Sequence, residues 1–120
     1  MKSKALGSIL NNDIDNILAA GSGPKTTPAE YKKAVMHLLD ARPGVLAQNV
    51  GMPDPVIYRS RVATPLDRYL SEVTQAVWPE TAEEDAQRQP AAMRRLFEAG
   101  TDPLALTIEA CRERSVPIVA

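Results

Sequence analysis

The chain has few cysteines, few aromatic residues and no long apolar run, and each shortage excludes a class of protein. Cys111 is the single cysteine among the 120 residues, so an internal disulfide and a Cys-rich metal framework are both excluded. Aromatic residues make up 4% of the chain, and no apolar run approaches the roughly 20 residues of a membrane span. Asn11, Asn12 and Asp13 interrupt the amino-terminal segment before an apolar stretch of signal-peptide length develops. These shortages predict a soluble, cytoplasmic protein with no membrane partner.

An excess of charge of either sign is also missing. Fourteen basic and fifteen acidic residues give a formal net charge of -1 and are spread along the chain. Such a surface has no field that attracts nucleic acid, so no nucleic-acid partner is predicted. An EF-hand is excluded, because its calcium loop requires a polar residue and a glycine after Asp13 and Asp15, and Ile17 and Leu18 occupy those positions. No cofactor is predicted, and no residue is assigned as a metal ligand.

Short apolar runs alternate with amphipathic segments, which is the pattern of an α/β protein. Strands are predicted at residues 5–10, 45–50 and 116–120. The last of these runs is apolar on both sides and stops without a loop or a polar tail, although a buried strand needs neighbours that cover it. The sequence therefore predicts one incomplete domain over residues 1–120, with about three parallel strands and intervening helices, cut off after a core strand.

Capping residues mark where the helices begin. Thr27, Pro28 and Glu30 have the residue types of an N-cap, a first helical position and a third position, which predicts a helix as far as about Ala41. Similar starts predict helices at residues 65–77 and 81–99, and Pro90 is expected to break or kink the second of these, which would divide it into two short helices if it breaks. The last predicted helix covers residues 103–114, and its buried face consists of Leu104, Ile108 and Cys111.

Three segments resemble parts of glycosyl-hydrolase-like barrel proteins. Residues 101–120 combine an Asp-Pro helix start, a basic helix end and an apolar strand, and this unit is similar to those of that family. Residues 9–16 and 45–51 are similar to the first strands of uncharacterised bacterial proteins of the same kind. Ser115 departs from the pattern, because such units usually have glycine after the helix. The resemblance implies the N-terminal portion of a TIM-barrel-like (β/α) domain and does not fix a substrate.

In a (β/α) barrel the chemistry lies at the carboxyl ends of the strands, which directs attention to the polar residues that follow each predicted strand. Asp13 is the candidate catalytic carboxylate, with Asp15 behind it. Asn11, Asn12 and Asn16 are candidate substrate-binding residues, because amide groups hydrogen-bond to sugar hydroxyls. A hard cation is an alternative ligand for this oxygen-rich segment. The simpler interpretation is that asparagine and aspartate form a turn and cap the next helix.

Further candidates follow the second predicted strand. Gln48 and Asn49 supply amide groups to the same edge of the sheet if the two strands are parallel neighbours, although Asn49 also suits a turn. Arg59, with Arg61, offers paired donors to a carboxylate or phosphate, although surface arginines without such a role are commoner. His37 and Cys111 are interpreted as a solvated side chain and a core thiol, respectively.

Two classes of function are compatible with these residues. The first is a glycoside-hydrolase-like enzyme, whose chemistry requires two carboxyl groups about 5 to 10 Å apart. Asp13 provides one, so the isolated chain is expected to be inactive until further strands supply the other. The second is a non-catalytic module that binds a carbohydrate or a protein. The predicted partners are accordingly a carbohydrate ligand, the rest of the same domain, or further copies of the chain through open sheet edges.

Overall fold

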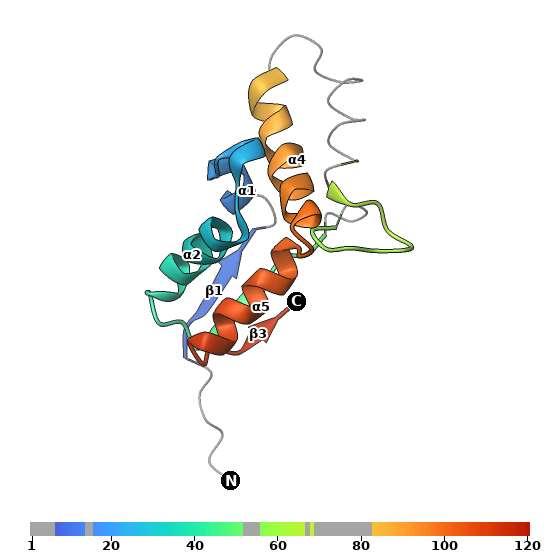
Figure 1. Ribbon diagram of the computed structural model, residues 1–120. Coiled ribbons are helices and arrows are strands. Elements are labelled where there is room, and N and C mark those ends of the chain that lie inside the picture. Colours follow the sequence, from blue (N-terminus) through green and yellow to red (C-terminus); the bar gives the residue numbers. More distant parts are fainter. Residues whose placement is uncertain (1–6, 14–15, 52–55, 67, 69–82) are drawn as a thin grey trace.

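The computed structural model describes residues 7–13, 16–51, 56–66, 68 and 83–120, and it has an α/β architecture (Figure 1). A three-stranded sheet contains β1 (Ile9–Asn12), β2 (Val45–Gln48) and β3 (Ile118–Val119) in that order, and both pairs of strands are parallel. The helical elements are α1 (Asn16–Ala20), the 3-10 turn η1 (Gly23–Lys25), α2 (Pro28–Leu39), α4 (Glu83–Glu98) and α5 (Pro103–Glu113). The predicted α/β class with three parallel strands is therefore confirmed.

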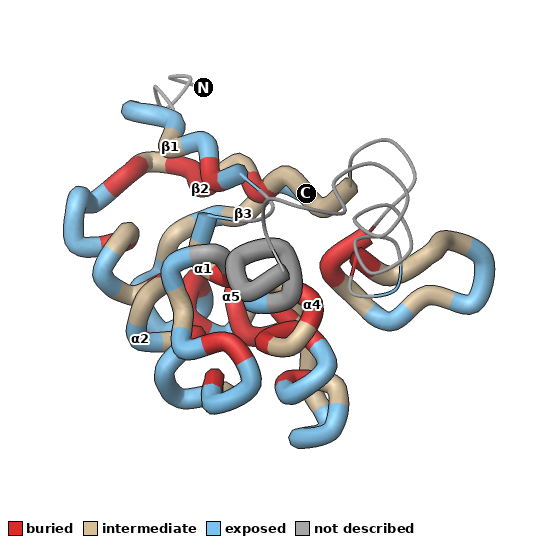
Figure 2. Tube along the Cα trace, turned by 90° about the horizontal axis from the view of Figure 1, so that it is seen from above, coloured by how far each residue is buried: buried red, intermediate tan, exposed pale blue. Residues whose placement is uncertain are grey.

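The described helices cover one face of the sheet, as seen from above in Figure 2. The register places Leu10 beside Leu46 and Leu46 beside Ile118, and these three side chains pack into the core under the helices. The residues that alternate with them point to the opposite face. On that face Val45 in the central strand is buried, whereas Ile9 and Val119 in the edge strands are 65% and 60% exposed. We call this second surface the open face.

Helix α2 begins as its sequence predicts. The Thr27 hydroxyl oxygen accepts a hydrogen bond from the backbone N–H of Glu30 at 3.1 Å, and Pro28 occupies the first turn. Tyr31, Val35 and Leu39 are buried at four-residue spacing, so one face of the helix packs on the sheet. The helix ends at Leu39, two residues before the predicted end, and the backbone turns at Arg42, whose φ is +52°.

Helix α5 also begins at its predicted cap, where a carboxylate oxygen of Asp102 accepts from the backbone N–H of Ala105 at 2.8 Å. It ends in a Schellman motif, in which the N–H of Val116 donates to the carbonyl of Cys111 at 2.9 Å. Ser115 takes the left-handed position of this motif with a φ of +53°, so the turn forms without the glycine that the barrel-like units usually have.

The predicted buried face of α5 is only partly right. Cys111 is buried, whereas Leu104 and Ile108 are half-exposed, because the helix buries the side that carries Leu106, Thr107 and Ala110. The sequence pattern used for the prediction followed large apolar residues, and it therefore did not identify this side of the helix. The Thr107 hydroxyl donates to the carbonyl of Pro103 at 2.8 Å, which allows a polar residue to lie in the core.

Of the two effects expected at Pro90, the break is not found, because α4 is one continuous helix with this proline inside it. A proline in a helix interior lacks the backbone N–H and costs about 3 kcal/mol. Pro90 is fully buried, together with Met93 and Leu96 of the same helix, so burial of the ring in the core offsets that cost.

The strands also differ from their predicted limits. β1 begins at Ile9 and ends at Asn12, so Asn11 and Asn12 belong to the strand and not to the loop after it. The last strand consists only of Ile118 and Val119, and as an edge strand it is not buried on both sides as predicted. The helix predicted at residues 65–77 lies almost wholly outside the described residues.

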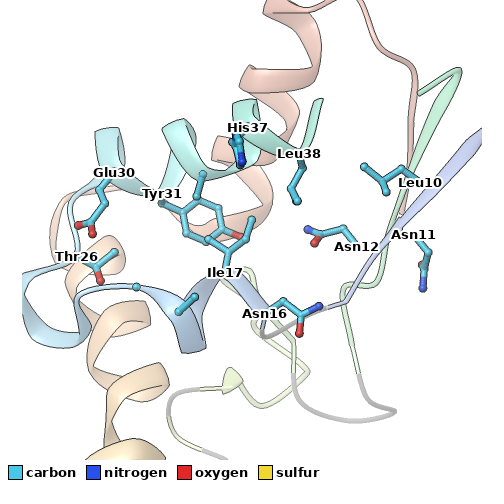
Figure 3. A pocket seen from close by; sticks show the side chains of 13 residues that line it. Leu10, Asn11, Asn12, Asn16, Ile17, Thr26, Glu30, Tyr31, His37 and Leu38 are labelled. Carbon is cyan, nitrogen blue, oxygen red and sulfur yellow. The ribbon is translucent and has the colours of Figure 1, made fainter. Parts of the chain in front are cut away.

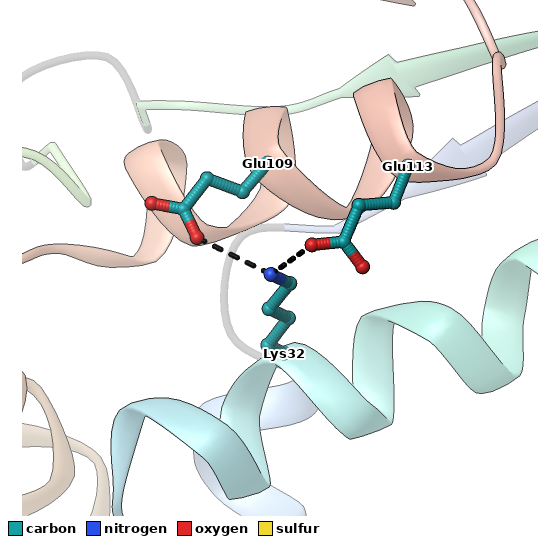
Figure 4. Close-up of polar contacts among 3 residues, drawn as sticks. All are labelled: Lys32, Glu109 and Glu113. Carbon is teal, nitrogen blue, oxygen red and sulfur yellow. Dashed lines mark hydrogen bonds and ion pairs between the residues drawn. The ribbon is translucent and has the colours of Figure 1, made fainter.

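An ion-pair cluster joins α2 to α5 (Figure 4). The Lys32 ammonium lies 3.4 Å from a carboxylate oxygen of Glu109 and also pairs with Glu113. The hydrogen bond to Glu113, and the charges of both carboxylates, raise the pKa of Lys32. A second pair joins Arg114 to Asp40 at 3.0 Å, so the two helices that lie over β2 are linked at two places.

Tyr31 gives a test of this helix packing, because burial raises the pKa of its phenol to about 12. The unfolded chain ionises this phenol near pH 10, so the stability that the neutral phenol contributes is complete below pH 10 and is lost as the pH rises towards 12. We expect Tyr31→Phe, which keeps the buried ring, to change the free energy of unfolding by less than about 1 kcal/mol at pH 7, and to show a flatter loss of stability above pH 10. Urea denaturation across this range is the measurement, and parallel pH profiles for the two proteins would contradict the expectation.

The open sheet edges predict self-association. Exposed strand edges with apolar side chains pair readily with other chains, and both β1 and β3 have one unpaired side within the described sheet. We expect the sedimentation coefficient of the chain to rise with concentration, and Val119→Lys to reduce this rise. Val62→Lys is the matched control, because Val62 is 99% exposed on the loop between β2 and α4. An equal effect of the two substitutions, or a monomer at every concentration, would show that the edges are not responsible.

Candidate functional site

Neighbouring asparagines of β1 point to opposite sides of the sheet. The register pairs Asn12 with Gln48 and Asn11 with Ala47. Figure 3 shows Asn12 on the helix side of the strand and Asn11 pointing away from it. The candidate residues at the carboxyl end of β1 therefore divide into two groups, and only one of these groups faces the open side of the sheet.

The helix-side group is a buried amide pair. Asn12 and Gln48 are 5% and 4% exposed, and Asn12 Nδ2 donates to Gln48 Oε1 at 2.8 Å. Gln48 Nε2 donates in turn to the backbone carbonyl of Asn49 at 2.9 Å. Gln48 Nε2 also lies 3.4 Å from the backbone carbonyl oxygen of Asn12, and the two bonds between Asn12 and Gln48 fasten the carboxyl ends of β1 and β2 to each other. The structure thus gives both amides a role in holding the strands, and the prediction that they bind substrate stays a prediction.

The open-face group consists of Asn11, Asp13 and Asn49, which we call the carboxyl rim. Asn11 Nδ2 lies 3.5 Å from Asp13 Oδ1, and both side chains are exposed. The N–H of Asn49 donates to the carbonyl of Asn12 at 3.0 Å, which continues the ladder by one step and sets Asn49 opposite Asp13. By alternation from Ala47, Asn49 lies on the open side, and its Oδ1 accepts from the Gly51 N–H at 3.3 Å.

Two other predicted site residues lie elsewhere, and a third falls outside the described residues. Asn16 is the first residue of α1 and borders a pocket on the helix side, and Asp15 lies outside the described residues. The Arg59 guanidinium stands over the Phe97 ring, 5.3 Å from its centroid, and donates to the Phe97 carbonyl. These contacts hold the loop after β2 against α4, so Arg59 is not brought together with the carboxyl rim.

The pocket between β1, α1 and α2 has a volume of about 400 Å³ and was not predicted from the sequence (Figure 3). It brings together Asn12 of β1, Asn16 of α1, Glu30 and Tyr31 of α2, and Thr26, which lies between η1 and α2. The residues from α2 and its start carry capping or core signals in the sequence, and nothing in their spacing indicates a cavity. The pocket arises from the way β1, α1 and α2 pack together.

His37 and Cys111 lie where the sequence predicts. His37 is 85% exposed at the end of α2, with Nδ1 at 3.6 Å from an Asp40 carboxylate oxygen. Cys111 is 1% exposed in the core, and burial raises the pKa of its thiol, so it remains protonated and packs as a small apolar group.

Within the described ranges, no three His, Cys, Asp or Glu side chains come together as metal ligands. No helix in that part of the chain has the length and apolar character to cross a membrane. Comparison of the sequence with protein-family models finds no match, and comparison with curated proteins finds none either. Function therefore has to be inferred from the geometry of the site.

The opposite orientations of Asn11 and Asn12 predict opposite sensitivities to mutation. We expect Asn12→Ala to reduce the free energy of unfolding by about 1–3 kcal/mol, because it leaves the buried Gln48 carbonyl oxygen without a donor. Asn11→Ala, its exposed neighbour, is expected to change stability by less than about 0.5 kcal/mol. Urea denaturation of both variants at low protein concentration is the test. Equal losses would mean that the amide pair does not hold the strands.

Proposed function

We propose that the carboxyl rim binds a carbohydrate, and that the chain acts as part of a carbohydrate-active protein of (β/α)-barrel type. The observation that carries the proposal is the meeting of Asn11, Asp13 and Asn49 at the carboxyl ends of two adjacent parallel strands, on the face that the described helices leave open. In α/β proteins this end of the strands is where ligands bind.

The sheet has features that suit a barrel. Its strands follow one another in sequence order, all parallel, and the helices between them lie on one face. In a closed barrel the helices form the outer layer and the other face becomes the packed interior, which is rich in branched side chains. Ile9, Val45 and Val119 on the open face are residues of that kind. The barrel interpretation gives these side chains an interior environment.

The chemistry of the carboxyl rim suits a polyhydroxylated ligand. Amide groups donate and accept hydrogen bonds, and the carboxylate of Asp13 is a strong acceptor for hydroxyl groups. The side chains of Asn11 and Asp13 are exposed, so a ligand can reach them without a rearrangement of the core. No lysine or arginine belongs to this rim, which favours an uncharged sugar over a phosphorylated one.

Hydrolysis needs more than this rim contains. Glycosidases use two carboxyl groups about 5 to 10 Å apart, one as acid and one as base or nucleophile. Asp13 is the single carboxylate among the three rim residues, so the chain by itself is expected to bind without cleaving. In the complete site Asp13 acts as one member of the pair, and its partner comes from outside the rim.

A titration with neutral oligosaccharides tests the proposal. The probes are cellobiose, maltose and xylobiose, and binding is followed by two-dimensional NMR at the backbone amides of residues 11–13 and 49. We expect at least one probe to shift these signals, and Asp13→Ala to weaken its binding about tenfold or more through loss of a charge-assisted hydrogen bond. No release of monosaccharide is expected.

Glu98→Gln is the matched control, because it removes an exposed carboxylate at the end of α4, where Glu98 pairs with Arg95. It should leave oligosaccharide binding unchanged. The proposal is wrong if none of the three probes shifts the rim signals, or if Asp13→Ala binds as tightly as the unmodified chain.

A further inference from the structure

The two edges of the described sheet differ in what lies beside them. β1 and β3 are both edge strands, and no described strand continues the sheet beyond either of them. β3 has two residues, whereas β1 has four and borders the pocket between β1, α1 and α2. The free edge of β1 therefore offers an incoming strand a longer row of backbone groups, together with a cavity beside it.

The hydrogen bonds of β1 show which backbone groups lie on its free edge. The carbonyl oxygens of Ser8 and Asn12 accept hydrogen bonds from backbone N–H groups at the start of β2 and just after its end, at 3.2 Å and 3.0 Å. In a parallel ladder, residues that bond to one neighbour alternate with residues whose N–H and carbonyl groups point the other way. The backbone groups of Ile9 and Asn11 therefore point away from β2, towards the free edge.

Leu10 lies between these two residues and faces the helices. Its side chain packs against the core and lines the pocket, but it is only half-buried. Asn11 also borders the pocket, although its side chain points to the other side of the strand (Figure 3). The pocket therefore extends to the backbone of the free edge, where a side chain from an added strand would lie beside Leu10.

We propose that the free edge of β1 pairs with β1 of a second copy, antiparallel, about a twofold axis that passes between the two Leu10 residues. Ile9 of each copy then lies opposite Asn11 of the other, and each of these two pairs exchanges both of its backbone hydrogen bonds. The two Leu10 side chains lie directly opposite each other on the helix side, each at the pocket of the other copy. The dimer has one continuous sheet, with the described helices of both copies on the same face.

The side chains favour this axis over one that passes between the two Asn11 residues. That second register places Leu10 opposite Asn12 of the other copy, although Asn12 is 5% exposed and already hydrogen-bonded to a side chain of β2. It also places the apolar Ile9 opposite the charged Asp13. The register about Leu10 pairs leucine with leucine, and the four residues of β1 carry no charge that would be repelled across the axis.

Two substitutions at Asn11 test the backbone pairing. Asn11→Pro removes an N–H on the free edge and leaves the bonds to β2 in place, because an edge strand tolerates proline where its N–H faces outward. We expect it to weaken dimerisation at least tenfold in sedimentation equilibrium, since the dimer loses this hydrogen bond in both copies. Asn11→Ala keeps the N–H and is the matched control, which should dimerise as the unmodified chain does. Val119→Lys, which acts on the β3 edge, should still form the dimer.

Mixed-label NMR gives the register on the unmodified chain, so it decides the case even if Asn11→Pro is destabilised. In a mixture of isotope-labelled and unlabelled copies, we expect a contact between the Leu10 α-proton of one copy and that of the other, because these residues form a closely spaced antiparallel pair. The proposal is overturned by a monomer at every concentration, by unchanged dimerisation of Asn11→Pro, or by contacts that pair Leu10 with Asn12 of the other copy. Sugar binding is read separately, from the oligosaccharide titration of Asp13→Ala, so either proposal can fail without the other.

Discussion

The register between β1 and β2 determines where every polar side chain at this end of the sheet points. Leu10 pairs with Leu46, and both face the helices, so burial of these two leucines fixes the register. A slip of one residue would turn Leu10 out of the core and bring Asn11 into it. The hydrophobic contacts thus select an arrangement in which Asn12 is buried and Asn11 is exposed, and the amide pair with Gln48 adds a specific bond to that choice.

The helix layer follows from the same sheet. Helix α2 packs Tyr31, Val35 and Leu39 inward, and α5 lies beside it with Ala110 and Cys111 in the core. The ion pairs of Lys32 lie at the partly exposed surface between the two helices, where such pairs contribute little to stability. Packing of apolar faces is therefore what holds the helices on the sheet, and the charges help to define how α2 and α5 lie next to each other.

Local signals in the sequence predicted the parts of the fold that are determined locally. The caps at Thr27 and Asp102 gave correct helix starts, because an N-cap depends on a hydrogen bond between residues three positions apart. The predicted limits of β1 were wrong because Asn12 belongs to the strand through backbone pairing with β2, where its partner Gln48 lies 36 residues away in the sequence. The absence of a break at Pro90 could not be predicted for a related reason, since the burial that offsets the cost of this proline comes from tertiary packing.

The sequence predicted which residues belong to the candidate site, but it did not predict which of their side chains lie on the same face of the sheet. The sequence singled out the polar positions after each strand, and the structure brings Asn11, Asp13 and Asn49 together at one edge of the sheet. The separation of Asn11 from Asn12 depends on strand alternation, which could not be read while both were taken as loop residues. The pocket between β1, α1 and α2 had no sequence signal, because it depends on how these three elements pack together.

The two turns that lead from a covering helix into a strand have an unusual composition. Arg42 precedes β2 and Ser115 precedes β3, and both adopt left-handed backbone conformations, with φ values of +52° and +53°. For residues other than glycine this conformation costs about 1 kcal/mol, and Arg42 is further restricted because Pro43 follows it. The chain therefore enters its second and third strands through strained backbone at Arg42 and Ser115. Glycine at these two positions would remove that strain and raise the free energy of unfolding.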